Sequence, residues 1–228
     1  MPVAVIVAVD GPAGSGKSSV CRGVAAALGL RYLDTGAMYR AMTCAVIQEG
    51  IDPSDAQAVA AFARIPVIDS GVDPLAPTIS VNGADVSAPI RSELVTSAVS
   101  PVSAVPEVRS RLVELQRDHV ANAREAGVGI VVEGRDIGSV VLPDADLKIY
   151  LTADPAVRAR RRAAETGTDA VGATEAALKA RDAFDSSRAT SPLTQADDAI
   201  VVDTTEMTLQ QVIDHVCDLV HQRRENDV

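Results

Sequence analysis

Residues 11–18 read Gly-Pro-Ala-Gly-Ser-Gly-Lys-Ser and match the phosphate-binding loop pattern G-x-x-x-x-G-K-[ST], the P-loop. The P-loop follows an apolar run at 3–9, which is predicted to be a buried strand, and precedes a predicted helix at 20–28. A strand, a glycine-rich turn and a helix in this order bring backbone N–H groups and a positive helix end around one anion. The chain is therefore predicted to bind a nucleotide where its first strand meets its first helix.

Two side chains of the P-loop are expected to act directly on that nucleotide. Lys17 can reach the β- and γ-phosphates as a point charge, and the Ser18 hydroxyl can ligate Mg²⁺. The glycines at 11, 14 and 16 let the backbone turn sharply and approach the phosphate oxygens closely.

Composition limits the kind of protein and the kind of partner. A chain of 228 residues with 47% hydrophobic content can form one α/β domain with insertions. It has no apolar stretch of about 18 to 20 residues and no basic leader, so we expect no membrane partner, no signal peptide and a cytoplasmic location. The formal charge of −10 argues against nucleic acid as a partner and favours a small anionic ligand.

Short apolar runs alternate with helical patterns, as βαβ architecture requires. The runs predict five strands of a parallel sheet at 3–9, 31–33, 129–132, 147–151 and 199–202. Further helices are predicted at 36–48, 106–126 and 208–224.

Two segments interrupt this pattern. Residues 64–91 hold Asn82-Gly83, a strong signal for a two-residue hairpin turn, between runs at 78–81 and 84–87. With 66–69 as a third strand, they predict a small antiparallel sheet. Residues 155–192 predict two helices joined by a turn at 167–174, a lid hairpin that could fold over a site.

Polar residues follow two of the predicted parallel strands. Arg40 stands about one turn into the helix after the second strand, where it could clamp a phosphate. Glu133 ends the third strand where an acid could orient Mg²⁺ through water. Arg135 could neutralise phosphate, and Asp136 could accept hydrogen bonds from an amine or hydroxyl.

Charge spacing in the lid hairpin predicts a second anion-binding surface. Arg158, Arg161 and Arg162 stand at i, i+3 and i+4 and therefore share a helix face. Three arginines together repel one another unless an anion lies nearby, and phosphoryl transfer develops such negative charge. Arg181, Asp185 and Arg188 share a face of the next helix.

Taken in order, these segments resemble the bacterial cytidylate kinases, within the nucleoside monophosphate kinase group, over nearly the whole chain. The resemblance rests on Asp10–Ser18, Asp34-Thr-Gly-Ala-Met-Tyr-Arg40, Ser92-Glu93 leading to Arg109, Glu133-Gly-Arg-Asp-Ile-Gly-Ser-Val-Val-Leu-Pro143, Arg158-Ala-Arg-Arg-Arg162 and Arg181-Asp-Ala-Phe-Asp-Ser-Ser-Arg188. One departure is Glu133, where members of the family often carry Asp.

The resemblance implies an α/β P-loop kinase core with a five-stranded parallel sheet flanked by helices, a small antiparallel insert in the monophosphate-binding region and a helical lid. It implies transfer of the γ-phosphoryl group of ATP to CMP or dCMP with Mg²⁺, giving ADP and CDP or dCDP in pyrimidine nucleotide metabolism. By analogy with the family, the chain is expected to be a monomer.

The resemblance also implies a division of the chain and a set of site residues. The core is expected at 1–62, 106–154 and 193–228, the monophosphate-binding insert at 63–105 and the lid at 155–192. ATP is expected at Gly11, Pro12, Ala13, Gly14, Ser15, Gly16, Lys17, Ser18 and Ser19, with Arg158, Arg161 and Arg162 over its phosphates. The monophosphate substrate is expected at Thr35, Tyr39, Arg40, Arg135 and Arg181, its cytosine at Ser100, Arg109 and Asp136, and its sugar at Asp185 and Arg188.

Two other functions fit part of the sequence. A kinase for another small acceptor, such as uridylate or shikimate, would share the P-loop and the lid. A regulator that binds or hydrolyses ATP without phosphoryl transfer would share only the P-loop, and it would have no use for the second set of arginines at 40, 135 and 181.

Overall fold

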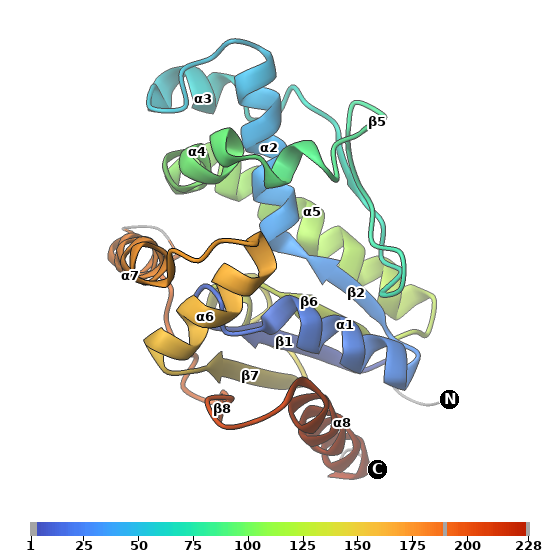
Figure 1. Ribbon diagram of the computed structural model, residues 1–228. Coiled ribbons are helices and arrows are strands. Elements are labelled where there is room, and N and C mark those ends of the chain that lie inside the picture. Colours follow the sequence, from blue (N-terminus) through green and yellow to red (C-terminus); the bar gives the residue numbers. More distant parts are fainter. Residues whose placement is uncertain (1–3, 189–190, 227–228) are drawn as a thin grey trace.

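The computed structural model describes residues 4–188 and 191–226 (Figure 1). Its centre is a five-stranded sheet in the order β2-β6-β1-β7-β8, and all neighbouring strands are parallel. The strands are β1 (Ile6–Asp10), β2 (Arg31–Asp34), β6 (Ile130–Glu133), β7 (Leu147–Thr152) and β8 (Ile200–Asp203). The predicted parallel sheet is confirmed, although the start of its first predicted run, Val3, lies outside the described residues.

The sheet is covered by helices on both faces because its strands bury alternate residues on opposite sides. Ile6 and Ala8 of β1 belong to one hydrophobic cluster, which includes residues of α5 (Pro106–Glu125). Val7 and Val9 belong to a second cluster with α1 (Lys17–Leu28) and α8 (Leu209–Asn226). The core is thus divided by the sheet, and the carboxyl ends of all five strands lie at one edge.

Helices α1 and α2 (Thr35–Gln48) begin at this edge, shortly after the carboxyl ends of β1 and β2. Helix α1 starts at Lys17, three residues earlier than predicted, because the left-handed Gly16 turns the P-loop directly into the helix and its carbonyl accepts from Val20 N at 3.1 Å. Helix α2 follows β2 without a loop, since the Asp34 carboxylate caps it by accepting from Ala37 N at 2.8 Å.

The predicted antiparallel sheet is also present, in the upper part of Figure 1. It contains β3 (Ile68–Ser70), β4 (Ile79–Val81) and β5 (Ala84–Asp85), in that order. Asn82 and Gly83 have φ values of 50° and 80°, which suit the predicted two-residue turn. The last strand is shorter than expected because the Asp85 carboxylate accepts from the backbone N–H and the hydroxyl of Ser87, turning the chain away.

Several elements were not predicted from the sequence. Helix α4 (Glu93–Ala104) contains Pro101, a residue that ordinarily ends a helix, and it packs against α2. The other unpredicted elements are the short helix α3 (Ala56–Phe62), the 3-10 helix η1 (Pro89–Arg91) and the π-helix η2 (Ile137–Val141).

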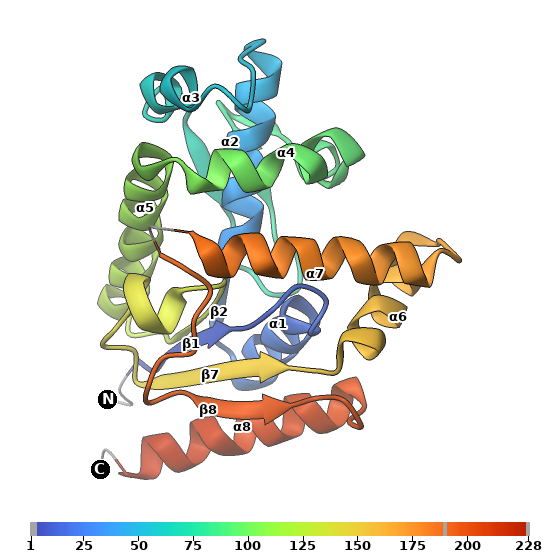
Figure 2. The ribbon, with the colours of Figure 1, turned by 90° about the vertical axis from the view of Figure 1, so that its left-hand side faces the viewer.

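The lid hairpin consists of α6 (Pro155–Thr166) and α7 (Val171–Ser187), which pack against each other. Its turn is shorter than predicted because Gly167, in the left-handed conformation, ends α6 at once and α7 already begins at Val171. Residues 189–190 of the predicted lid lie outside the described part. Figure 2 shows α7 running between the P-loop side of the core and the region of α2 and α4.

Within the described residues, no helix is both long and apolar enough to cross a membrane. The division into core, insert and lid at the predicted boundaries stays a prediction.

Candidate active site

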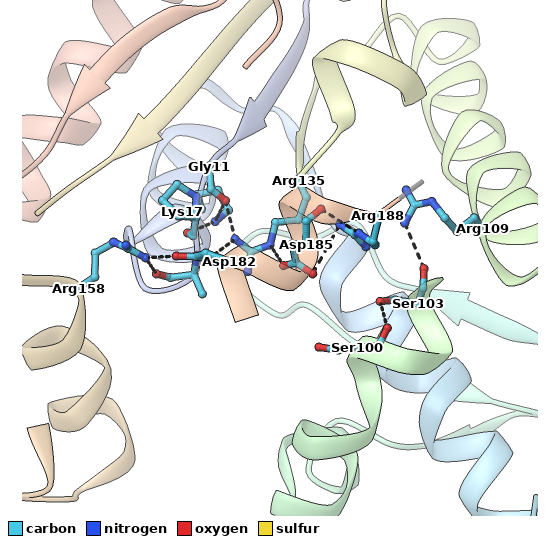
Figure 3. Close-up of polar contacts among 12 residues, drawn as sticks. Gly11, Lys17, Ser100, Ser103, Arg109, Arg135, Arg158, Asp182, Asp185 and Arg188 are labelled. Carbon is cyan, nitrogen blue, oxygen red and sulfur yellow. Dashed lines mark hydrogen bonds and ion pairs between the residues drawn. The ribbon is translucent and has the colours of Figure 1, made fainter. Parts of the chain in front are cut away.

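The P-loop is positioned by β1 and closely approaches β7. Gly11 has φ of 143°, and a Cβ atom there would stand 2.0 Å from the carbonyl oxygen of Leu151, so only glycine fits. Lys17 donates from Nζ to the carbonyls of Gly11 and Pro12, each at 2.8 Å (Figure 3). Burial and the neighbouring Arg135 lower the pKa of Lys17 from its usual value. The ammonium group is therefore held over the loop by weak acceptors that an anion can replace.

Glu133, at the end of β6, lies beside the start of α1. The Tyr32 hydroxyl donates to its Oε1 at 2.7 Å, and its Oε2 is buried with no hydrogen-bond partner among the described residues. Burial and the nearby Asp34 carboxylate raise the pKa of Glu133, while the neighbouring Ser18 hydroxyl acts to lower it. Thr35 Oγ1 donates to the Glu133 carbonyl at 2.7 Å, so this predicted substrate contact is engaged with β6.

These oxygens suit a hard cation that takes only one or two ligands from the protein. Mg²⁺ usually keeps several waters and completes its octahedron with substrate phosphates. In the described part of the chain, no group of three or more His, Cys, Asp or Glu side chains could hold a metal. The Ser18 hydroxyl and the unpartnered oxygen of Glu133 therefore fit a Mg²⁺ ion that arrives with a nucleotide.

Four guanidinium groups converge beyond the same edge of the sheet, and we call them the arginine cluster: Arg40 of α2, Arg135 after β6, Arg162 of α6 and Arg181 of α7. Burial, together with Arg181 and Arg162, lowers the pKa of Arg40 to about 10. Burial and Arg135 lower the pKa of Arg181, with Arg162 acting in the same direction. Neighbouring guanidinium groups thus raise the cost of keeping Arg40 and Arg181 charged, and an anion beside them would relieve it.

Some members of the arginine cluster are also fixed by protein atoms. Arg40 donates to the Ile90 carbonyl at 3.1 Å and to Thr96 Oγ1 at 2.9 Å. Arg135 donates to the Gly11 carbonyl at 2.7 Å, which joins the segment after β6 to the P-loop. Such contacts orient the guanidinium planes before any ligand arrives.

A buried ion pair lies next to the arginine cluster. Arg109 of α5 pairs with Asp136, and their side chains are only 3% and 5% exposed. The Arg109 guanidinium also stands over the Tyr39 ring, 5.3 Å from its centroid. Its Nη1 donates to the Ser103 carbonyl at 3.4 Å, and the Ser103 hydroxyl donates to the Ser100 carbonyl at 2.9 Å. The structure thus brings together the residues predicted to read cytosine.

The residues predicted at the sugar join this arrangement from α7 and from the position directly after it. Asp185 is buried, and its Oδ2 lies 3.2 Å from Arg135 Nε. Arg188 donates from Nε to the Asp185 carbonyl at 3.2 Å. Buried Nε atoms of Arg109 and Arg181 have no hydrogen-bond partner among the described residues, which marks the interior of the site as the place for a polar ligand.

The arginines of α6 do not lie together as their spacing suggested. Arg158 is buried, and it donates to Asp182 Oδ2 at 2.5 Å and to the Ala13 carbonyl at 2.8 Å. Arg161 donates to the hydroxyl and carbonyl of Thr204, after β8, at 2.8 and 2.7 Å. Only Arg162 belongs to the arginine cluster, because tertiary acceptors from different segments separate the three side chains.

Two further acids take part that the sequence did not single out as site residues. Asp10 accepts from Ile137 N at 2.8 Å and from Gly138 N at 2.7 Å, and burial raises its pKa to about 6. It thereby fixes η2, and with it Asp136, to the start of the P-loop. Asp182 contacts the P-loop itself; the only hint of it in the sequence is that it directly follows Arg181.

Comparison with known proteins agrees with this geometry. The family profile described as cytidylate kinase matches residues 7–222. The chain belongs to the cytidylate kinase family.

Curated relatives in this family are similar over almost their whole length. A cytidylate kinase of Streptomyces avermitilis is 61% identical over 221 residues, covering 97% of this chain and 94% of the relative. A cytidylate kinase of Mycolicibacterium paratuberculosis is 53% identical over 225 residues, covering 97% of each. A solved shikimate kinase of Acinetobacter baumannii covers 97% of this chain and 95% of its own with a TM-score of 0.47 and 12% identity, too remote to bear on the substrate.

As a member of this family, the chain is an ATP-dependent nucleoside monophosphate kinase that phosphorylates CMP or dCMP. The resemblance stated from the sequence motifs is therefore confirmed.

Proposed function

We propose that this kinase holds ATP on the P-loop and CMP or dCMP beside Arg109, so that the γ-phosphate and the acceptor phosphate meet at the arginine cluster. The observation that carries this assignment is the convergence of Arg40, Arg135, Arg162 and Arg181 from four separate elements. Two phosphates brought to one place carry several negative charges, which a set of fixed guanidinium groups can balance.

The donor side uses the P-loop and the start of α1. Backbone N–H groups of residues 11 and 13–19 surround the triphosphate, and Lys17 exchanges its loop carbonyls for phosphate oxygens. Mg²⁺, held by the Ser18 hydroxyl and through water by Glu133, would neutralise charge on the β- and γ-phosphates. Arg158 and Arg161 of α6 border the same loop through Ala13 and through Thr204.

The acceptor side reads the base by hydrogen-bond polarity. The carboxylate of Asp136 accepts hydrogen bonds and therefore suits the exocyclic amine of cytosine, whereas uracil carries a carbonyl there. Arg109 supplies donors to the ring acceptors and is held by Asp136 and the Tyr39 ring. Asp185 and Arg188 would contact the sugar, and Ser100 would border the base.

Phosphoryl transfer at this site depends more on positioning the two substrates than on transferring a proton. The acceptor is already a phosphate oxyanion, so no general base is required, and α6 and α7 contribute by excluding water that would otherwise compete as acceptor. By analogy with the family, we propose that the enzyme works as a monomer in the cytoplasm.

The assignment is tested by turnover of a panel of acceptors with ATP and Mg²⁺: CMP, dCMP, UMP, AMP and shikimate. We expect CMP and dCMP to be phosphorylated fastest, with CDP or dCDP as product. Faster turnover of AMP or shikimate would contradict the proposed base site. ATP hydrolysis without CDP formation would instead favour the regulator.

Proton exchange gives a second test, specific to the P-loop. Because the pKa of Lys17 is lowered in the free protein and a triphosphate favours its charged form, ATP binding should take up protons between that lowered pKa and the ordinary value of 10.5. Affinity for ATP should therefore fall as the pH rises through this range.

The measurement is calorimetric titration with ATP at alkaline pH in buffers of different ionisation enthalpy. Omitting Mg²⁺ avoids proton release from Glu133, whose pKa is raised in the free protein. Uptake approaching about one proton is expected for a single responding group. Proton release, or no exchange at any pH, would contradict a Lys17 that is partly neutral in the free protein and charged beside the triphosphate.

A further inference from the structure

Asp182 occupies a position in the site that none of the assigned roles explains. It lies on α7, and its side chain is 16% exposed. Oδ1 accepts from the P-loop N–H of Ala13 at 2.9 Å, and Oδ2 accepts from Arg158 Nη1 at 2.5 Å. Arg135 Nη1 stands 3.8 Å from Oδ1. Figure 3 shows Asp182 between Arg158 and Arg135, next to the P-loop.

The groups around Asp182 are those expected around a phosphate. A P-loop backbone N–H and two guanidinium groups are typical donors to phosphoryl oxygens. A carboxylate resembles a phosphoryl group in presenting several anionic oxygens from one atom. The Asp182 carboxylate is therefore an anionic group of the protein itself that lies against part of the proposed nucleotide-binding surface.

We propose that Asp182 is an internal substitute for a nucleotide phosphate and a competitor of ATP for the P-loop. This inference rests on the proposed role of the P-loop as the ATP site. Without nucleotide, Asp182 neutralises Arg158 and Arg135 and fastens α7 to Ala13. When ATP binds, its phosphate oxygens take over these donors and Asp182 is displaced.

This arrangement has two opposing effects on binding. The ion pairs keep both arginines in place, so less order must be gained when the triphosphate arrives. The same negative charge repels that triphosphate, so part of the attraction of Arg158 and Arg135 is used to displace Asp182. The repulsion is the larger effect, because the arginines have other anchors: Arg158 also donates to the carbonyls of Ala13 and Ala153, and Arg135 to that of Gly11.

The substitution Asp182→Asn removes the negative charge of the side chain while keeping nearly the same size and shape. Asparagine can keep an oxygen for the Ala13 N–H, but it carries no charge that competes with phosphate. We expect the dissociation constant of ATP, measured by calorimetry without CMP and Mg²⁺, to fall about fivefold or more, the effect of one charge a few ångströms away even at the dielectric constant of water. A gain in affinity is not what damage to the fold would produce.

Two variants control the result. Glu175→Gln removes the same charge from the same helix, but Glu175 pairs with Lys179, 2.7 Å away and 60% exposed. It should leave ATP binding unchanged. Asp182→Glu keeps the charge and should bind ATP more weakly than Asp182→Asn.

Unchanged or weaker ATP binding by Asp182→Asn would overturn the inference, as would equal tightening by Glu175→Gln. Failure of the proposed role of the P-loop looks different, because the unaltered enzyme would then not bind ATP. If the unaltered enzyme binds ATP and Asp182→Asn does not tighten it, only the role of Asp182 is wrong.

Discussion

Lys17→Ala is expected to lower the turnover number by at least about two orders of magnitude, the scale on which removed transition-state stabilisers act. Lys17 is held over the P-loop by the carbonyls of Gly11 and Pro12, at the start of α1. Its charge is lost without replacement in the variant, since no other lysine side chain is described in contact with the P-loop. The measurement is the initial rate of CDP formation with saturating ATP and CMP.

The matched control is Lys179→Ala, which removes an exposed lysine whose partner is Glu175 on the same helix. Its turnover number should equal that of the unaltered enzyme. Turnover near normal in Lys17→Ala, with an intact fold by circular dichroism, would contradict the role given to the P-loop lysine.

Arg109→Ala is expected to lower the free energy of unfolding by about 3–5 kcal/mol, the usual cost of breaking a buried ion pair by removing one partner. Asp136 would remain buried without its countercharge, and the Tyr39 ring would lose the cation above it. Urea denaturation followed by circular dichroism measures this loss. In kinetics, the variant should require more CMP while its requirement for ATP changes little.

Two comparisons test whether the loss of stability comes from breaking the buried Arg109–Asp136 ion pair rather than from removing any arginine. Arg64→Ala breaks an ion pair with Glu114 whose side chains are 62% and 45% exposed, and it should lower the free energy of unfolding far less than Arg109→Ala does. Adding Asp136→Asn to Arg109→Ala removes the orphaned charge and should restore part of the stability. If Arg109→Ala costs no more than Arg64→Ala, the pair does not behave as buried. If only the ATP requirement rises, the cytosine site is misplaced.

Elements with a clear local pattern were predictable, and those without one were not. The parallel strands and helix α5 follow the period of their apolar residues, and the turn at Asn82-Gly83 follows from residues that tolerate positive φ. Helix α4 was missed because Pro101 lies inside it, where packing against α2 outweighs the local preference.

The candidate site divides in the same way. The P-loop could be found because its function depends on consecutive residues that fold together at one strand–helix junction. Asp10 and Asp182 could not, because the backbone N–H groups that they accept from lie 127 and 169 residues away in the chain, at Ile137 and Ala13. Helical spacing placed Arg158, Arg161 and Arg162 on one face but did not indicate that each has a different partner.

The amino-acid sequence by itself determined the parallel α/β architecture, the P-loop and the family. Each of these depends on local periodicity or on contiguous motifs. Tertiary structure alone decided which arginines converge, which are already engaged, and that Asp182 stands against the P-loop. The physical reason is that charge interactions depend on distance in space and on burial. Both are fixed only when β1, β6 and the lid helices meet at one edge of the sheet.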